Sequence, residues 1–360
     1  MSYLKRIENL QNHLLGDNIN FLILDEPVSL FYLTGLHLSS AKMIVGQNSS
    51  SLFVDGRYIE VAMKKAPCKV ILIEGDSQSD FLLEHASQKT KVAFDGDSFT
   101  YSAYENLKTF LLHLEKTSKL SFELVSLKNP LRDIRVIKTQ DEISFLRKAA
   151  GVNWKGFEYI CSKLKVGVSE KSLALGYELF CREHGAERLS FEPIICFGAN
   201  SAMPHHHSDE TTLKANDIVL IDIGVVVDNY NSDFTRVVFF GERDPLLDNF
   251  YSIIKRAHSK ALSLCKPGVH VGDIDKAARD LITQEGYGKE FLHSLGHGVG
   301  LEVHEFPRLR FDGADKDAIL RPGMVITIEP GIYKAGLGGV RYEDTILITK
   351  DGYENFYAST

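Results

Sequence analysis

LIDIGVVVDNYNSDFTR, residues 220–236, is the stretch from which the fold and the chemistry of this chain are best approached. It continues an apolar strand predicted over residues 218–223, and that strand contains a carboxylate, Asp222. An ionised carboxylate in such a strand is costly unless it is paired or binds a metal. Alternation along the strand places Asp222 on the same face as Leu220 and Gly224.

A tight turn is predicted a few residues later in the same stretch. Asp228 and Asn229 have the chemistry of a hairpin turn, and apolar residues flank them. Asp233 then follows Asp222 by 11 positions (233 − 222). We therefore expect the two carboxylates to meet at one point on paired strands.

Two later stretches supply further polar side chains. His297 lies between two glycines, where the backbone can approach a ligand closely. The strand predicted over residues 324–330, MVITIEP, places Glu329 on the same face as Thr327 and ends at a proline. Each stretch thus adds one metal-ligating type of side chain.

The last contributing stretch is VRYEDT, residues 340–345, which we interpret as one strand with Arg341, Glu343 and Thr345 on one face. Four clustered carboxylates raise one another's pKa and could not all stay ionised alone. Two divalent cations would balance the four charges, and oxygen-rich ligation with a single imidazole favours manganese, with cobalt or zinc as alternatives. The predicted ligands are Asp222, Asp233, His297, Glu329 and Glu343.

The motifs LIDIG with NYNSDFTR, GHGVGLEVHE, ITIEPGIY and VRYEDT occur in this order, and with them the chain resembles the pita-bread metallopeptidases. The resemblance is to the branch with Xaa-Pro aminopeptidases (aminopeptidase P) and Xaa-Pro dipeptidases (prolidases). It implies an α+β C-terminal pita-bread domain with a curved antiparallel sheet and the site on its concave face. It also implies an α/β N-terminal domain of the ribonuclease-H-like, creatinase/prolidase type, and a homodimer.

The resemblance also implies roles for individual side chains. Glu329 would ligate a metal and act as the base that takes a proton from the attacking water. His205, 17 positions before Asp222 (222 − 205), and His304, seven after His297 (304 − 297), would contact substrate and stabilise the oxyanion. Arg341 would pair with a ligand carboxylate or reach substrate, and Tyr333 would help to wall the proline pocket.

The remaining histidines are interpreted without a role in chemistry. His206 and His207 are expected in a solvated polar loop, next to the functional His205. His258, His270 and His293 match no family role, and we expect them at the surface or in packing.

Composition excludes several classes of partner. The chain has 360 residues, with 41 basic and 48 acidic residues and a net charge of −7, which gives no reason to expect nucleic acid or a membrane surface as partner. Its five cysteines are scattered, without CxxC spacing, and are typical of reduced packing residues. No apolar run approaches the length of a membrane span or a signal core, so a cytoplasmic enzyme is expected.

Two domains are predicted, over residues 1–130 and 131–360, with the junction near residues 128–138. In the first, an amphipathic helix over residues 4–15 precedes alternating strands and helices, with strands at 21–25, 51–58, 68–74, 91–95 and 122–127. In the second, Thr139 and Glu142 form a predicted capping box that opens a long helix. Further helices are expected to end near His184 and to cover about 246–265 and 271–285.

The preferred function is an Xaa-Pro aminopeptidase acting on proline-containing peptides. An Xaa-Pro dipeptidase is the main alternative, and it requires a closed end that recognises a free carboxylate, which the sequence does not reveal. A non-catalytic binding module is a third reading, disfavoured by the intact ligand set. Creatinase-like amidinohydrolases lack these ligands, and methionyl aminopeptidases usually lack so large an N-terminal domain.

Overall fold

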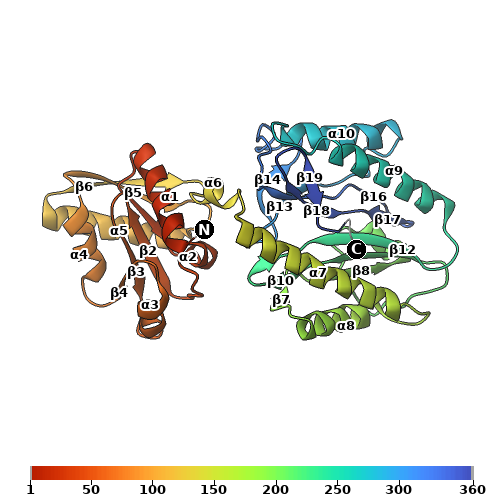
Figure 1. Cartoon of the computed structure of the whole chain (residues 1–360), viewed down its shortest axis with the longest axis horizontal. Coiled ribbons are helices and arrows are strands. Elements are labelled where there is room, and N and C mark those ends of the chain that lie inside the picture. Colours follow the sequence, from red (N-terminus) through yellow and green to blue (C-terminus); the bar gives the residue numbers. More distant parts are fainter. Residues whose placement is uncertain (1, 358–360) are drawn as a thin grey trace. The chain divides into compact units, whose positions relative to one another are not determined.

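The computed structural model describes residues 2–357. The chain forms two compact units, of which the first ends at Arg135 and the second begins at Val136 (Figure 1). Each unit has its own sheets and its own apolar core.

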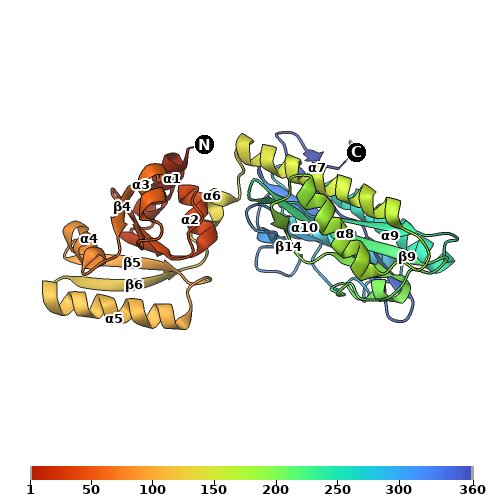
Figure 2. The ribbon, with the colours of Figure 1, turned by 90° about the horizontal axis from the view of Figure 1, so that it is seen from below.

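A six-stranded mixed sheet is the centre of the first unit. The elements of this unit are α1 (Tyr3–Gly16), β1 (Phe21–Leu24), α2 (Pro27–Thr34), β2 (Ala41–Gly46), β3 (Ser50–Val54), α3 (Ile59–Lys65), β4 (Lys69–Leu72), α4 (Ser77–His85), β5 (Lys89–Asp95), α5 (Tyr101–Ser118), β6 (Ser121–Leu127) and α6 (Arg132–Arg135). The strand order is β4-β3-β2-β1-β5-β6, and β1, β5 and β6 are mutually parallel. Helix α5 lies along β5 and β6 (Figure 2), and its buried leucines join the core of the sheet.

The five strands predicted in this unit are confirmed, whereas α2, β2 and α4 were not predicted. Helix α2 begins at Pro27, three residues after β1 ends at Leu24. Its start is marked by Glu26, whose carboxylate accepts hydrogen bonds from Val28 N and Ser29 N, and by Pro27 in the first turn. Helix α2 and β2 complete the sheet and one of its covering layers.

The second unit contains antiparallel sheets with two pairs of helices. Its helices are α7 (Gln140–Lys163), α8 (Glu170–Glu183), η1 (Gly198–Ala202), α9 (Pro245–Leu262) and α10 (Val271–Gln284). Its strands are β7 (Arg188–Leu189), β8 (Ile194–Phe197), β9 (Ile218–Ile223), β10 (Val225–Val227), β11 (Tyr230–Asn231), β12 (Phe234–Phe239), β13 (Gly296–Gly298), β14 (Glu305–Leu309), β15 (Val325–Ile328), β16 (Gly331–Lys334), β17 (Gly338–Arg341), β18 (Asp344–Ile348) and β19 (Tyr353–Asn355). A five-stranded sheet has the order β14-β13-β15-β18-β19, two three-stranded sheets have the orders β12-β9-β8 and β11-β10-β7, and β16 pairs with β17.

Strand β9 lies between two apolar layers, one on each of its faces. Val219 and Ile221 join the core formed with α7 and α8. Ile218 and Leu220, on the opposite face, join the core formed with α9 and α10. Because side chains alternate along a strand, Asp222 shares the second face, as predicted. The two helical pairs lie on either side of the strands in Figure 1.

The local signals that place the two aspartates are confirmed. Asp228 and Asn229 both have positive φ, 49° and 71°, and join β10 to β11 as a tight hairpin. Strand β12 then pairs with β9 in a register that sets Thr235 opposite Asp222. The predicted capping box of α7, formed by Thr139 and Glu142, is also present.

One predicted strand is two strands. VRYEDT was expected to be continuous, but β17 ends at Arg341 and pairs with β16, whereas β18 begins at Asp344 and pairs with β15. Glu343 lies at the break and forms an isolated bridge with Thr235 of β12. The chain changes sheet here because Glu343 N donates to the Thr235 carbonyl, and this crossing carries Glu343 to the two aspartates.

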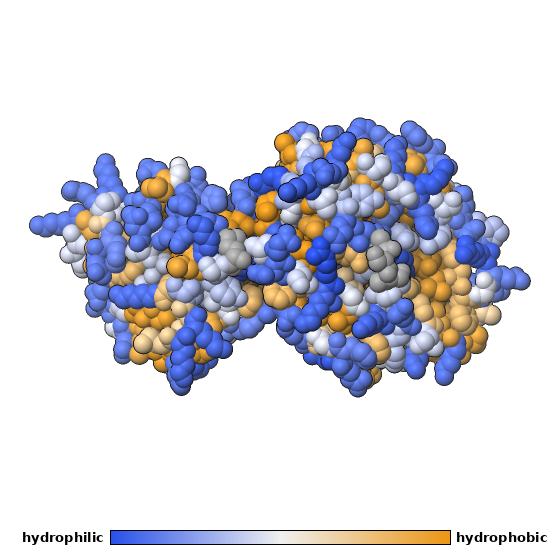
Figure 3. Space-filling model, viewed as in Figure 1, coloured by the Kyte–Doolittle hydropathy of each residue, from blue (hydrophilic) through white to orange (hydrophobic). Residues whose placement is uncertain are grey.

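None of the helices within residues 2–357 is both long and apolar enough to cross a membrane. On the face drawn in Figure 3, polar residues are interspersed with apolar ones.

Candidate metal centre

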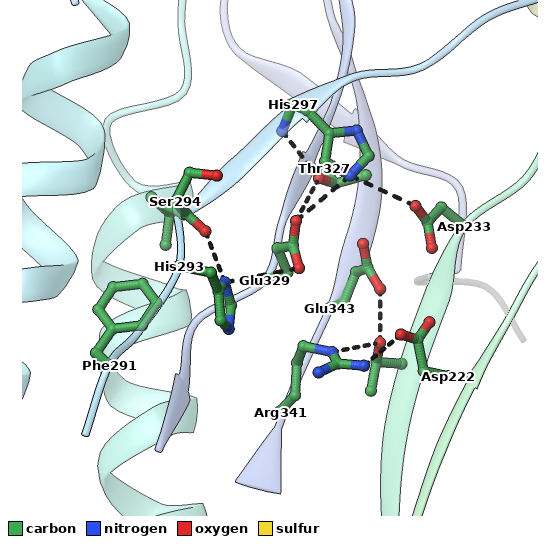
Figure 4. Close-up of polar contacts among 12 residues, drawn as sticks. Asp222, Asp233, Phe291, His293, Ser294, His297, Thr327, Glu329, Arg341 and Glu343 are labelled. Carbon is green, nitrogen blue, oxygen red and sulfur yellow. Dashed lines mark hydrogen bonds and ion pairs between the residues drawn. The ribbon is translucent and has the colours of Figure 1, made fainter. Parts of the chain in front are cut away.

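The five predicted ligands converge in the second unit. Figure 4 shows Asp222, Asp233, Glu329, Glu343 and His297 pointing toward a common centre from separate segments, either within strands or next to strand ends. Four of them are buried, with 2–8% of their surface exposed, and the Glu329 side chain is 16% exposed. His297 Nε2 lies 3.5 Å from Asp233 Oδ2 and 3.4 Å from Glu329 Oε1. The structure therefore brings together side chains that span 121 positions of sequence (343 − 222).

Arg341 and Thr235 orient two of the carboxylates. The Arg341 guanidinium donates through Nη2 to Asp222 Oδ2 and through Nε to Thr235 Oγ1 at 3.1 Å. Thr235 Oγ1 in turn donates to Glu343 Oε2 at 2.7 Å. The predicted pairing of Arg341 with a ligand carboxylate is thus what the structure shows. In Asp222 and in Glu343, one carboxylate oxygen thus accepts a hydrogen bond from these donors and the other oxygen does not.

Those other oxygens, Asp222 Oδ1 and Glu343 Oε1, are buried and have no hydrogen-bond partner among the described residues. An unpaired buried carboxylate oxygen is strongly unfavourable. Both lie where the five side chains meet, so the set has the donor chemistry of a site for divalent cations. The residues therefore fit the ions that were predicted for them.

His297 presents its Nε2 to this centre as an acceptor. Its Nδ1 lies 3.0 Å from the Gly298 carbonyl, which can only accept, so Nδ1 carries the proton and Nε2 has a free lone pair. Burial, with the neighbouring His304 as a second cause, lowers the pKa of His297 to about 3. A neutral imidazole with a free Nε2 is the form that binds a metal.

The carboxylates show the electrostatic crowding that was predicted from their number. Burial, followed by the charge of Glu343, raises the pKa of Asp233 and of Glu329 well above the ordinary values. Burial and then Asp222 raise the pKa of Glu343 to about 8. Protons and divalent cations therefore compete for the same oxygens.

A cavity of about 640 Å³ opens beside the cluster, which is ample for a dipeptide. His205, His304, Arg341 and all five predicted ligands line it. The His304 ring stands edge-on to the His297 ring, with centroids 4.3 Å apart, and burial lowers the pKa of His304. The structure thus places both predicted substrate-contacting histidines at the cavity.

Tyr333 was predicted to wall the proline pocket, but it does not line this cavity. It is 4% exposed, and its hydroxyl lies between Arg341 Nη1 at 2.7 Å and His293 Nε2 at 2.9 Å. Its partners hold it behind the cavity surface, so it acts as a connector between two cavity residues.

His293 was missed as a site residue, because it was assigned to packing or the surface. It lines the cavity, and its Nδ1 lies 4.0 Å from Glu329 Oε2. Burial and then Arg341 lower the pKa of His293 to about 3, so the ring is neutral and its Nε2 accepts from the Tyr333 hydroxyl. Its position, four residues before the predicted ligand His297 in the same segment, could have indicated that His293 lies near the site.

The assignment of His206 to a solvated loop was also wrong, whereas that of His207 is confirmed. The His206 side chain is 9% exposed, and its Nε2 lies 2.7 Å from the buried carboxylate of Glu170. The His207 side chain is 81% exposed. The partner of His206 lies 36 positions away, so the local sequence could not show it.

The chain matches two family models that together cover most of it. Residues 144–350 match the metallopeptidase family M24, and residues 6–137 match the creatinase/prolidase N-terminal domain. It is 34% identical over 350 residues to an Xaa-Pro dipeptidase of Pyrococcus furiosus, covering 97% of this chain and 96% of that protein.

Two solved structures show the same similarity. The Xaa-Pro dipeptidase from Bacillus anthracis has a TM-score of 0.91 and 33% identity, covering 100% of this chain and 98% of the other. The X-Pro aminopeptidase from Thermotoga maritima has a TM-score of 0.83 and 28% identity, covering 96% and 97%. These matches confirm the predicted fold class, a creatinase-type α/β domain followed by a pita-bread domain. The chain therefore belongs to metallopeptidase family M24, with a creatinase/prolidase N-terminal domain preceding its peptidase domain.

Proposed function

We propose that the protein is an Xaa-Pro dipeptidase, which hydrolyses the amide bond before a C-terminal proline. This reverses the order of the two specificities expected from the sequence, where the aminopeptidase was preferred. The reversal is supported by the relatives named Xaa-Pro dipeptidase and, above all, by the position of Arg308.

Arg308 is the cation that a free carboxylate would meet. It pairs across strands with His297 in the β13–β14 ladder, so both side chains extend from the same face. It lines the cavity, and its Nε donates to Ser294 Oγ at 3.2 Å. Within residues 2–357 no carboxylate forms an ion pair with it. The Arg308 guanidinium, one strand away from the metal ligands, suits the C-terminal carboxylate of a dipeptide. In a longer peptide the proline carbonyl belongs to a neutral amide, which offers a weaker partner.

Two divalent ions would be held by five side chains, Asp222, Asp233, His297, Glu329 and Glu343. Oxygen-rich ligation favours a hard metal, so the ions are proposed to be Mn²⁺. Such ions supply a water molecule that loses its proton near neutral pH. Glu329 would accept that proton, because it is the most exposed of the four carboxylates and already lies beside Thr327 Oγ1, at 3.5 Å.

His205 and His304 would stabilise the charge that develops on the scissile carbonyl oxygen, because both line the cavity and carry N–H donors. The bonded series Arg341, Tyr333 and His293 fixes the wall behind the reacting group. A fixed wall reduces the reorganisation needed when charge develops.

The test compares Ala-Pro, Ala-Pro-amide and Ala-Pro-Ala as substrates of the Mn²⁺-loaded protein. A charged hydrogen bond is worth about 1.5–3 kcal/mol, so we expect kcat/KM for Ala-Pro to exceed that for the amide by roughly 10- to 100-fold. Arg308→Met should remove this preference, and Arg308→Lys should retain part of it. Equal turnover of all three substrates by the unsubstituted protein would refute the dipeptidase assignment.

An Xaa-Pro aminopeptidase is the second candidate, and it is supported by the similarity to the Thermotoga maritima enzyme. Efficient cleavage of Ala-Pro-Ala would favour it. The homodimer stays a prediction of the family resemblance, and the cytoplasmic location stays a prediction from the sequence.

A further inference from the structure

A second polar cluster lies outside the metal centre, at the start of α8. It consists of Glu170, the first residue of that helix, together with His206 and Asp209 from the segment that follows η1. The Glu170 side chain is 0% exposed. A fully buried carboxylate needs partners for both of its oxygens.

Glu170 accepts four hydrogen bonds. Its Oε1 accepts from Phe197 N at 2.7 Å and from Asn200 Nδ2 at 3.0 Å. Its Oε2 accepts from His206 Nε2 at 2.7 Å and from Asp209 N at 3.2 Å. One carboxylate thus joins the end of β8, the helix η1 and the segment over residues 203–211.

The cluster has metal-ligating residue types, but its hydrogen bonds assign it a different role. Both oxygens of Glu170 are already used by N–H donors. A carboxylate only accepts, so His206 Nε2 carries a proton and is closed to a metal. Asp209 Oδ1 accepts from Thr211 N at 2.7 Å. The cluster is therefore a hydrogen-bonded support.

The segment that this support holds is the one that carries His205. His205 lines the cavity together with His293 and His304. The next residue, His206, also borders the cavity, but its Nε2 is bonded to Glu170. Two further backbone bonds, from Glu170 N to Thr211 O and from Lys171 N to Asp209 O, tie the far end of the segment to α8.

We propose that Glu170 and His206 are positioning residues that hold His205 in place at the reacting carbonyl. The proposal rests on the proposed peptidase function, in which His205 contacts the substrate. Displacing a group by about 1 Å can cost about 100-fold in rate, so losing the bond from His206 to Glu170 would lower the rate through the position of His205.

The kinetic test uses the full-length, Mn²⁺-loaded protein. His206→Ala should lower kcat for Ala-Pro by about 10- to 100-fold and leave KM within about twofold. His206→Gln should recover most of the rate, because its amide nitrogen can donate to Glu170 from the same place. Met203→Ala is the matched control, since its side chain lies in the same segment, is 47% exposed and does not line the cavity, and it should stay within about twofold of the unsubstituted protein.

Two further measurements separate positioning from general damage. In a His205→Ala background, adding His206→Ala should cost less than about twofold, because residues that act through one another are not additive. Hydrogen exchange of residues 203–209, measured without substrate, should be faster in His206→Ala than in His206→Gln, with metal content unchanged and exchange elsewhere in the peptidase domain unchanged.

The proposal would be overturned if His206→Ala lowered kcat by the same factor in the His205→Ala background as in the unsubstituted protein. Unchanged hydrogen exchange in residues 203–209 would overturn it as well. Failure of the unsubstituted protein to cleave any Xaa-Pro substrate would instead count against the proposed function. Because the exchange measurement requires no turnover, it still decides whether Glu170 and His206 hold the segment.

Discussion

Replacing Lys138 by methionine should destabilise the peptidase domain by several kcal/mol. Lys138 Nζ lies 2.9 Å from Glu305 Oε2, and the two side chains are only 2% and 7% exposed. Glu305 also lines the cavity, directly after His304. The methionine side chain fills much of the space of the lysine but removes the Lys138 ammonium from beside the buried Glu305 carboxylate. Breaking a buried pair in this way costs roughly 3–5 kcal/mol.

Urea denaturation followed by tryptophan fluorescence measures this loss, because the single tryptophan, Trp154, lies in α7 of the same unit. Lys138→Met combined with Glu305→Gln should recover most of the stability, since a neutral amide then replaces the buried Glu305 carboxylate. Lys148→Met, which removes a surface pair with Asp228, should cost less than about 1 kcal/mol. The reasoning is refuted if Lys138→Met costs as little as this control, or if the double variant is no more stable than the single one.

Three further predictions concern the metal centre and the strand that carries it. Asp233→Ala should lower bound metal and reduce kcat/KM by more than about 100-fold. Thermal unfolding should still show a folded protein, because Thr345 and Tyr357 donate to the backbone carbonyl of Asp233, which the alanine keeps. Normal metal content with normal turnover would contradict it. For the chelated protein, the raised pKa of Glu343, about 8 against 4.5, means that protonation favours the folded state. This stabilisation is complete below about pH 4.5 and is lost as the pH rises through about 8, so the urea midpoint should fall over that range; a flat profile would argue against it. Gly224→Ala would place a Cβ 2.3 Å from the Ser232 carbonyl oxygen. This contact should lower the free energy of unfolding, measured in urea, by roughly 1–3 kcal/mol. An unchanged free energy of unfolding would mean that the strand shifts to accept the methyl group.

The local signals in the sequence were sufficient for the elements that carry most of the ligands. The turn at Asp228 and Asn229 could be predicted because positive φ is readily adopted by these residue types. The capping box at Thr139 could be predicted because its two partners are three positions apart. Both features depend on neighbours in the chain, which a single sequence displays.

Features that depend on distant partners could not be predicted in this way. The division of VRYEDT into two strands results from the bridge between Glu343 and Thr235, 108 positions apart (343 − 235). His206 appears as one of three consecutive histidines until its partner Glu170 is known. The role of Tyr333 likewise follows from the two side chains between which its hydroxyl lies.

The dispersal of the five donors along the chain has a consequence for the lifetime of the protein. An unfolded chain keeps Asp222 and Glu343 121 positions apart (343 − 222), and it would hold a divalent ion only weakly. Divalent ions bound only by the folded protein would act as a reversible cross-link between distant segments, and they would stabilise the native state by mass action. The free concentration of the ion would govern how long each molecule survives, and scarcity would expose the idle enzyme to degradation.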